Sequence, residues 1–245
     1  AKKLNIFYVE HKKKIGGRYS VLSEVGIIPA YLMGINTFIL RSKLLDCLKG
    51  VGKKQLKESS IVLSTLLKSK RYNNLVFLNY SEDTEKLLFW CQQLIAESLG
   101  KKGMGFFPMI SNVPKDHHSL LQLYLDGPKD KIFYIFSYEK EGEEKLKKNI
   151  FDNKFKRLNK ISINDIANIQ KDSLIEVFKR KKILFRELRI SAINEETLSK
   201  LFSYFMLETF LIGIKMKINP FDQPAVEEVK KITLKKLNNR TKNYF

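Results

Sequence analysis

The chain has 245 residues, of which 44% are hydrophobic and 29% are charged, and its formal net charge is +19. This is the composition of a soluble globular chain with one large domain or two small ones. The only two cysteines, Cys47 and Cys91, have no paired spacing, which argues against a disulfide scaffold and a zinc module and fits a reducing cytoplasm. Both lie in helix-like apolar patterns, so we expect buried thiols.

The positive charge is spread over the whole chain in short lysine runs, and no zinc-finger, homeodomain or RNA-recognition signature accompanies it. A solvated basic surface is therefore favoured over a nucleic-acid-binding face. The first residues lack the design of a signal peptide. Residues 25–40 carry no charge, but they are short for a membrane span of about 20 residues and contain Pro29, Asn36 and Thr37. They predict a core helix or two short helices, and no membrane span.

The clearest strand and helix stand next to each other in the chain. Residues 75–79 form a short apolar run between polar residues, as expected for a buried parallel strand. Residues 81–100 follow with helical spacing of apolar positions, with Ser81 as the expected N-cap and Gly100 as the stop.

Further along, strand patterns alternate with helical ones. Strands are predicted at 131–138 and 182–188, and helices at 164–182, 195–216 and 221–239, the last an amphipathic helix. The charged run at 139–149 is expected to be a mobile surface loop. This alternation predicts an α/β fold.

Two clusters near glycines are the first candidates for a site. In Gly16-Gly17-Arg18-Tyr19-Ser20, glycine lets the backbone approach a ligand and a guanidinium suits an oxyanion, although a plain glycine turn with a surface arginine explains the run as well. In "AESLGKKGMGFFP" (96–108), Glu97 precedes a glycine-rich loop. This loop follows a helix, so it is not the dinucleotide-binding fingerprint, and Glu97 alone could be an exposed acid at a helix end.

Two further clusters contain an imidazole, an amide and an ammonium group. His117 and His118 are adjacent, so on a helix they diverge by about 100° and cannot easily bind one metal ion; no metal site is expected. Gln223 and Lys230 are seven residues apart and would share one helix face, although a lone lysine on a helix is usually solvated.

In their order along the chain, these clusters resemble the signatures of the glucose-6-phosphate isomerase family. Residues 15–26, "IGGRYSVLSEVG", are similar to the first family signature, and residues 213–230, "GIKMKINPFDQPAVEEVK", to the second. Between them, "AESLGKKGMGFFP" and "HHSLLQL" resemble the compact bacterial form. The resemblance spans nearly the whole chain, and it implies a three-layer αβα sandwich with a parallel sheet, that is, a sugar-isomerase (SIS-type) domain.

The resemblance also implies a reaction and a role for each site residue. The reaction is the reversible isomerisation of glucose 6-phosphate to fructose 6-phosphate through a cis-enediol, with Glu97 as the base. His118, supplied by the partner subunit, would help to open the sugar ring, and Lys230 would assist it. Arg18 would stabilise the charge of the enediolate, and Gly17, Arg18 and Gln223 would bind substrate. A homodimer without metal or organic cofactor is implied.

The resemblance divides the chain into a lead-in segment at 1–50, a C-terminal SIS-type domain at 51–218 and a C-terminal helix at 219–245. The first SIS-type domain of the family, with its phosphate-gripping Ser/Thr loop, is not found in this sequence. We therefore expect the C-terminal part of an isomerase, inactive by itself. The alternative is a non-catalytic SIS-type domain that binds a sugar phosphate.

Overall fold

The fold is built on a sheet of four parallel strands. The computed structural model describes residues 2–138 and 161–242. The strands are β1 (Asn74–Asn79), β2 (Phe107–Asn112), β3 (Lys131–Tyr138) and β4 (Phe185–Ile190), in the spatial order β2-β1-β3-β4. Every neighbouring pair is parallel, so helices must connect the strands.

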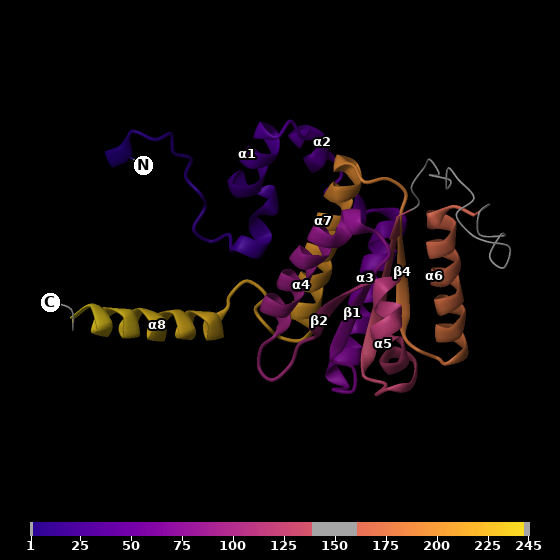
Figure 1. The fold of residues 1–245 in the computed structure, drawn as a ribbon. Coiled ribbons are helices and arrows are strands. Elements are labelled where there is room, and N and C mark those ends of the chain that lie inside the picture. Colours follow the sequence, from indigo (N-terminus) through magenta and orange to yellow (C-terminus); the bar gives the residue numbers. More distant parts are fainter. Residues whose placement is uncertain (1, 139–160, 243–245) are drawn as a thin grey trace.

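Eight α-helices accompany the sheet in the described part of the chain (Figure 1). They are α1 (Glu24–Leu32), α2 (Thr37–Ser42), α3 (Gly50–Lys68), α4 (Glu85–Leu99), α5 (Lys115–Asp126), α6 (Ile163–Arg180), α7 (Glu195–Lys215) and α8 (Pro224–Lys242). Side chains of α3, α4 and α7 share one apolar core with the sheet, and those of α5 and α6 share another on the opposite face. The predicted three-layer αβα sandwich with a parallel sheet is confirmed.

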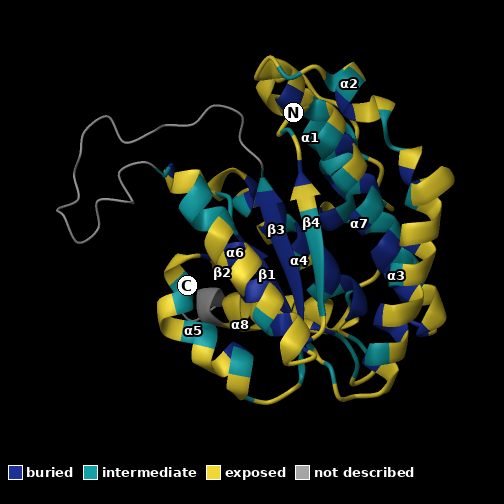
Figure 2. Ribbon diagram, turned by 90° about the vertical axis from the view of Figure 1, so that its right-hand side faces the viewer, coloured by how far each residue is buried: buried dark blue, intermediate teal, exposed yellow. Residues whose placement is uncertain are grey.

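The two central strands are buried on both faces, which explains their continuous apolar sequences (Figure 2). Phe77 in β1 and Ile135 in β3 are both 0% exposed. The strands predicted at 75–79 and 131–138 are thereby confirmed. The strand predicted at 182–188 runs instead from 185 to 190, because Lys182 has a left-handed backbone (φ 53°) that turns the chain after α6.

The helix predicted at 81–100 begins later than expected. A 3-10 turn (Glu82–Thr84) comes first, and the side chain of Ser81 makes no capping bond, so its prediction as N-cap is wrong. The Asn79 side chain accepts from Ser81 N (3.2 Å) and Thr84 Oγ1 (2.7 Å), and this fixes the turn. Gly100 follows the helix, as predicted.

Residues 25–40 form two short helices on the surface. The glycine at position 34 has φ 83° and separates α1 from α2. Tyr31, Leu32 and Phe38 are 70%, 77% and 84% exposed. The interpretation as a core helix is therefore wrong, and the alternative of two short helices is confirmed.

The predicted helix at 195–216 is α7, which by length and composition alone could cross a membrane. In this fold it packs on the sheet beside α3 and α4, and Phe205 and Ile212 belong to the core. The tail helix α8 extends away from the body (Figure 1), and its residues 224–239 are exposed. The surface loop predicted at 139–149 lies outside the described residues.

Candidate active site

Arg18 is the centre of the site, although it stands in a surface-like motif. It lies in a short 3-10 helix (Gly17–Leu22) and is only 1% exposed. All five of its N–H groups have acceptors within the chain, which is the full donor capacity of a guanidinium. The acceptors are Ser98 Oγ for Nε (2.8 Å), Glu97 Oε1 (2.9 Å) and Gln223 Oε1 (3.0 Å) for Nη1, and the carbonyl oxygens of Pro220 (2.7 Å) and Asp222 (3.1 Å) for Nη2.

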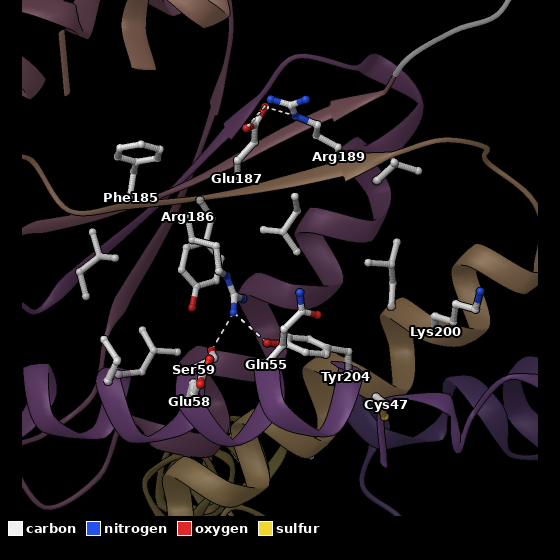
Figure 3. Close-up of a pocket in the computed structure, with 18 of the residues that line it drawn as sticks. Cys47, Gln55, Glu58, Ser59, Phe185, Arg186, Glu187, Arg189, Lys200 and Tyr204 are labelled. Atoms are coloured by element: carbon white, nitrogen blue, oxygen red, sulfur yellow. Dashed lines mark hydrogen bonds and ion pairs between the residues drawn. The ribbon is translucent and has the colours of Figure 1, made fainter. Parts of the chain in front are cut away.

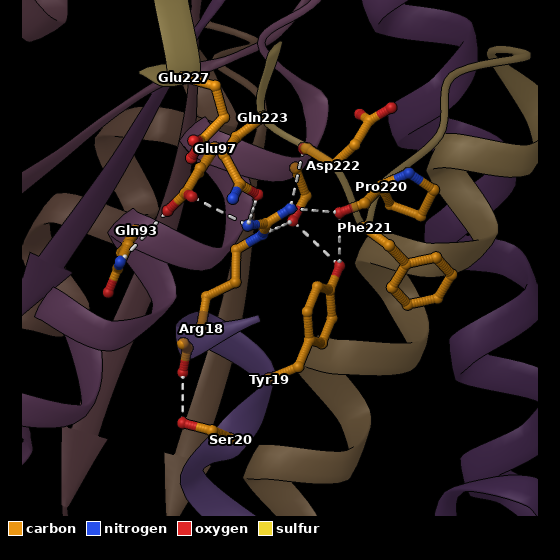
Figure 4. A network of polar contacts seen from close by, with 12 residues as sticks. Arg18, Tyr19, Ser20, Gln93, Glu97, Pro220, Phe221, Asp222, Gln223 and Glu227 are labelled. Atoms are coloured by element: carbon orange, nitrogen blue, oxygen red, sulfur yellow. Dashed lines mark hydrogen bonds and ion pairs between the residues drawn. The ribbon is translucent and has the colours of Figure 1, made fainter. Parts of the chain in front are cut away.

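These bonds join three segments that lie far apart in the sequence (Figure 4). They are residues 16–20, the last turn of α4, and residues 220–223 before α8. The glycine loop after α4 adds to the junction, because Lys101 Nζ lies 2.9 Å from a carboxylate oxygen of Asp222 and lowers the pKa of that carboxyl group. The three segments are the ones that carry the motifs.

Glu97 is held in place but remains open to solvent. One carboxylate oxygen accepts from Arg18 and the other from Gln93 Nε2 (3.2 Å), while the side chain is 24% exposed. Gln223 shares the Nη1 group of Arg18 with Glu97, so the amide and the carboxylate lie on the same side of the guanidinium (Figure 4). Gly17, which precedes Arg18 in the chain, is exposed.

The structure does not bring Lys230 into this hydrogen-bonded group. Lys230 is exposed on α8, where its ammonium donates to Glu227 (2.8 Å), and this bond raises the pKa of Lys230. Figure 4 shows Glu227 on the same side of the network as Glu97 and Gln223. Lys230 therefore lies about one turn further along α8 than Glu227, which faces the site.

His118 lies elsewhere in the fold. It is exposed on α5, which begins after the carboxyl end of β2 and packs on the α6 face of the sheet. Glu97 lies in the last turn of α4, which packs on the opposite face of the sheet and precedes the amino end of β2. The two predicted catalytic residues of one chain are thus separated by the sheet, and the role of His118 stays a prediction.

His117, the neighbour of His118, is held by a hydrogen bond to another residue of the chain. His117 Nε2 lies 3.1 Å from Tyr80 Oη, and burial lowers the pKa of His117, while the charge of Asp116 partly opposes this shift. Tyr80 is partly buried too, which raises the pKa of its phenol well above the ordinary value and keeps it protonated.

We predict that this environment makes stability depend on pH. With a lowered native pKa, His117 binds fewer protons in the native state than in the unfolded state below about pH 6.5. Its stabilising contribution is therefore present above that pH and is lost as the pH falls through the native pKa. The difference in urea midpoint between the unsubstituted chain and His117→Gln should shrink from pH 7.5 to pH 5. The matched control is His118→Gln on the exposed neighbour, and a pH-independent difference for His117→Gln would contradict the prediction.

A cavity of about 850 Å³ lies away from this site, between α3, β4 and α7 (Figure 3). Its floor holds Arg186, which donates to Glu208 (2.7 Å) and Ser59 (2.7 Å). None of the predicted site residues lines it. Within the described ranges, no three His, Cys, Asp or Glu side chains group as metal ligands would.

Sequence analysis did not identify all of the groups that surround Arg18. Ser98 and Tyr19 bond to each other (3.0 Å), and Trp90 Nε1 donates to the carbonyl oxygen of Arg18 (2.9 Å). A spacing of seven residues, about two helical turns, puts Trp90 on the same face of α4 as Glu97, a signal that could have indicated Trp90. The carbonyl acceptors at 220 and 222 are backbone atoms and leave no such signal.

No protein-family model matches the chain. Several curated proteins match it over most of its length. A probable glucose-6-phosphate isomerase of Methanococcus maripaludis is 32% identical over 239 residues, which are 94% of this chain and 53% of the relative. The glucose-6-phosphate isomerase of Methanocaldococcus jannaschii is 31% identical, over 95% of this chain and 58% of its own length. Over nearly its whole length, the chain is thus homologous to glucose-6-phosphate isomerases.

Two solved structures share the fold of the chain. A hypothetical protein from Thermus thermophilus matches 92% of the chain with a TM-score of 0.81 and 25% identity, and the match covers 56% of that protein. A glucose-6-phosphate isomerase from Chlamydia trachomatis shares the fold, with a TM-score of 0.70 at 15% identity, over 95% of this chain and 49% of that one. The chain spans about half the length of the curated relatives that it matches.

Proposed function

We propose that the protein carrying this chain interconverts glucose 6-phosphate and fructose 6-phosphate, with Glu97 as the base. The observation that carries the proposal is the Arg18 junction: one buried guanidinium holds the three motif segments around a carboxylate that solvent reaches. The curated relatives bear the name of this activity. The cytoplasmic location and the glycolytic role belong to the same proposal.

The chemistry asks for one well-placed proton acceptor. Glu97 would take the proton from C2 of the aldose and return it to C1 through a cis-enediol, a type of catalysis worth about 10²–10⁴ in rate. Negative charge develops on the enediol oxygens during this transfer. Arg18, whose Nη1 lies 2.9 Å from Glu97 Oε1, would stabilise this charge, because a fixed cation needs no reorganisation as the charge forms.

The other residues have supporting roles in the proposal. The amide of Gln223, held beside Glu97, and the exposed backbone at Gly17 would contact the substrate. His118 would open the sugar ring from a second copy of the chain in a homodimer, since its own sheet separates it from Glu97. Lys230 would assist from α8, close to Glu227 at the site.

Turnover of fructose 6-phosphate by the protein that carries this chain tests the proposal, with the 245-residue chain assayed beside it. We expect isomerisation by the former and none by the latter, because the Ser/Thr loop that grips the substrate phosphate in this family is not found among these 245 residues. Binding without turnover by both would overturn the proposal and favour the non-catalytic sugar-phosphate-binding domain. Normal turnover by the chain alone would refute its expected inactivity.

A further inference from the structure

The cavity beside β4 and the apolar helix surfaces indicate a ligand or partner less clearly than the surroundings of Arg18 indicate a role. In the cavity beside β4, the Arg186 guanidinium already bonds to Glu208, Ser59 and Tyr204. The apolar surfaces of α1, α2 and α8 have nothing on them that indicates what covers them. By contrast, the groups on the far side of Arg18 from Glu97 form a closed arrangement with defined donors and acceptors.

Four groups form this hydrogen-bond cycle: the Arg18 guanidinium, the Ser98 hydroxyl, the Tyr19 hydroxyl and the Pro220 carbonyl. Figure 4 labels Arg18, Tyr19 and Pro220. Arg18 Nε–H lies 2.8 Å from Ser98 Oγ, which lies 3.0 Å from Tyr19 Oη. Tyr19 Oη lies 3.1 Å from Pro220 O, which also accepts from Arg18 Nη2 at 2.7 Å.

The direction of each bond follows from chemistry. A guanidinium can only donate and a carbonyl oxygen can only accept, so Ser98 accepts from Arg18 and Tyr19 donates to Pro220. The hydroxyl hydrogen of Ser98 is then left to donate to Tyr19. Burial raises the pKa of Tyr19, so its hydroxyl stays protonated and able to donate. Since Ser98 is 0% exposed, water does not compete for the two bonds of its hydroxyl group.

We propose that Ser98, with Tyr19, is a positioning residue that fixes the orientation of Arg18 and thereby the places of Glu97 and Gln223; this rests on the proposed isomerase function. The cycle occupies the Nε and Nη2 groups on one edge of the guanidinium. Rotation of the guanidinium is thereby blocked, and Nη1 is directed at the carboxylate and the amide. In this role, neither Ser98 nor Tyr19 contacts the substrate.

The kinetic test uses Ser98→Ala and Tyr19→Phe, singly and together, in the protein that carries the chain. We expect each single variant to lower kcat about tenfold with KM changed less than about twofold, since a misplaced base costs rate rather than binding. The double variant should lose no more than the larger single loss, because both act on one cycle. The matched control is Ser60→Ala, a 1%-exposed serine in α3 whose hydroxyl donates to the carbonyl oxygen of Lys57 in its own helix; its kcat should not change.

A second readout is independent of turnover. In the unsubstituted chain, the Arg18 Nε–H signal in a ¹H–¹⁵N spectrum should exchange slowly with solvent, and Ser98→Ala should abolish that protection. If the unsubstituted protein has no isomerase activity, the proposed function fails while this spectrum still decides whether Ser98 holds Arg18. Unchanged Nε–H exchange in Ser98→Ala would overturn the positioning role. So would a lower melting temperature with unchanged kcat, or single losses of kcat that multiply in the double variant.

Discussion

Replacement of Glu97 by glutamine should lower the isomerisation rate by about 10²–10⁴-fold, the range that general base catalysis contributes. The amide has the shape of the carboxylate, and its oxygen can still accept from Arg18 Nη1, now at 2.9 Å from Glu97 Oε1. It cannot take up a proton from a carbon acid. Substrate affinity should therefore change much less than kcat, which separates loss of the base from loss of the site.

The measurement is steady-state turnover of fructose 6-phosphate together with its dissociation constant. Glu85→Gln is the matched control, because Glu85 begins the same helix at its far end and accepts from Asn112 Nδ2 (2.9 Å). It should retain the unsubstituted rate. An active Glu97→Gln variant would assign the proton transfer to another group and would leave Glu97 as a partner of Arg18 only.

Replacement of Arg18 by methionine should lower the free energy of unfolding by about 3–5 kcal/mol, because a 1%-exposed guanidinium loses all of its hydrogen bonds and a bond to a charged group contributes about 1.5–3 kcal/mol. The Asp222 carbonyl oxygen would lose its bond to Arg18, and the Pro220 carbonyl and the Ser98 hydroxyl would each keep only their bond to Tyr19. A buried polar group left without any partner costs about 1–3 kcal/mol. The effect reaches across the chain, because these acceptors belong to the segment before α8 and to the end of α4.

The free energy of unfolding of the Arg18→Met variant is measured by urea-induced unfolding of the chain. Arg180→Met is the control, since the Arg180 side chain is 70% exposed and lies 4.0 Å from Glu176 on the same helix; such surface pairs contribute about 0–1 kcal/mol. A loss below about 1 kcal/mol for Arg18→Met would mean that the three segments are held together by packing instead.

Sequence patterns predicted the centre of the sheet well and its edge poorly. In β1 and β3, burial on both faces requires an unbroken apolar run, and such a run is visible in the sequence. The edge strand β2 was missed because it is half exposed and contains Pro108, Ser111 and Asn112. Helix α3 was missed because its buried leucines are separated by lysines and serines that face solvent or bond to their own helix.

The sequence likewise predicted some features of the candidate site and not others. The order of the motifs predicted which segments matter, and the structure shows Arg18, Glu97 and Gln223 in direct contact. The sequence could not predict that the guanidinium would be fully used within the chain, because two of its acceptors are backbone carbonyls. Nor could it place His118 relative to Glu97, since this distance depends on which face of the sheet each helix covers.

The contact of Trp90 with Arg18 has a practical consequence. Trp90 is the only tryptophan of the chain, its indole N–H bonds to the Arg18 carbonyl, and its ring packs edge-on against Phe202 at 5.0 Å. The tryptophan fluorescence of the chain thus originates next to the proposed reaction centre. Emission wavelength and quenching by iodide will report any loosening of the guanidinium without an added label, and a ligand that seats on Glu97 will be visible in the same spectrum.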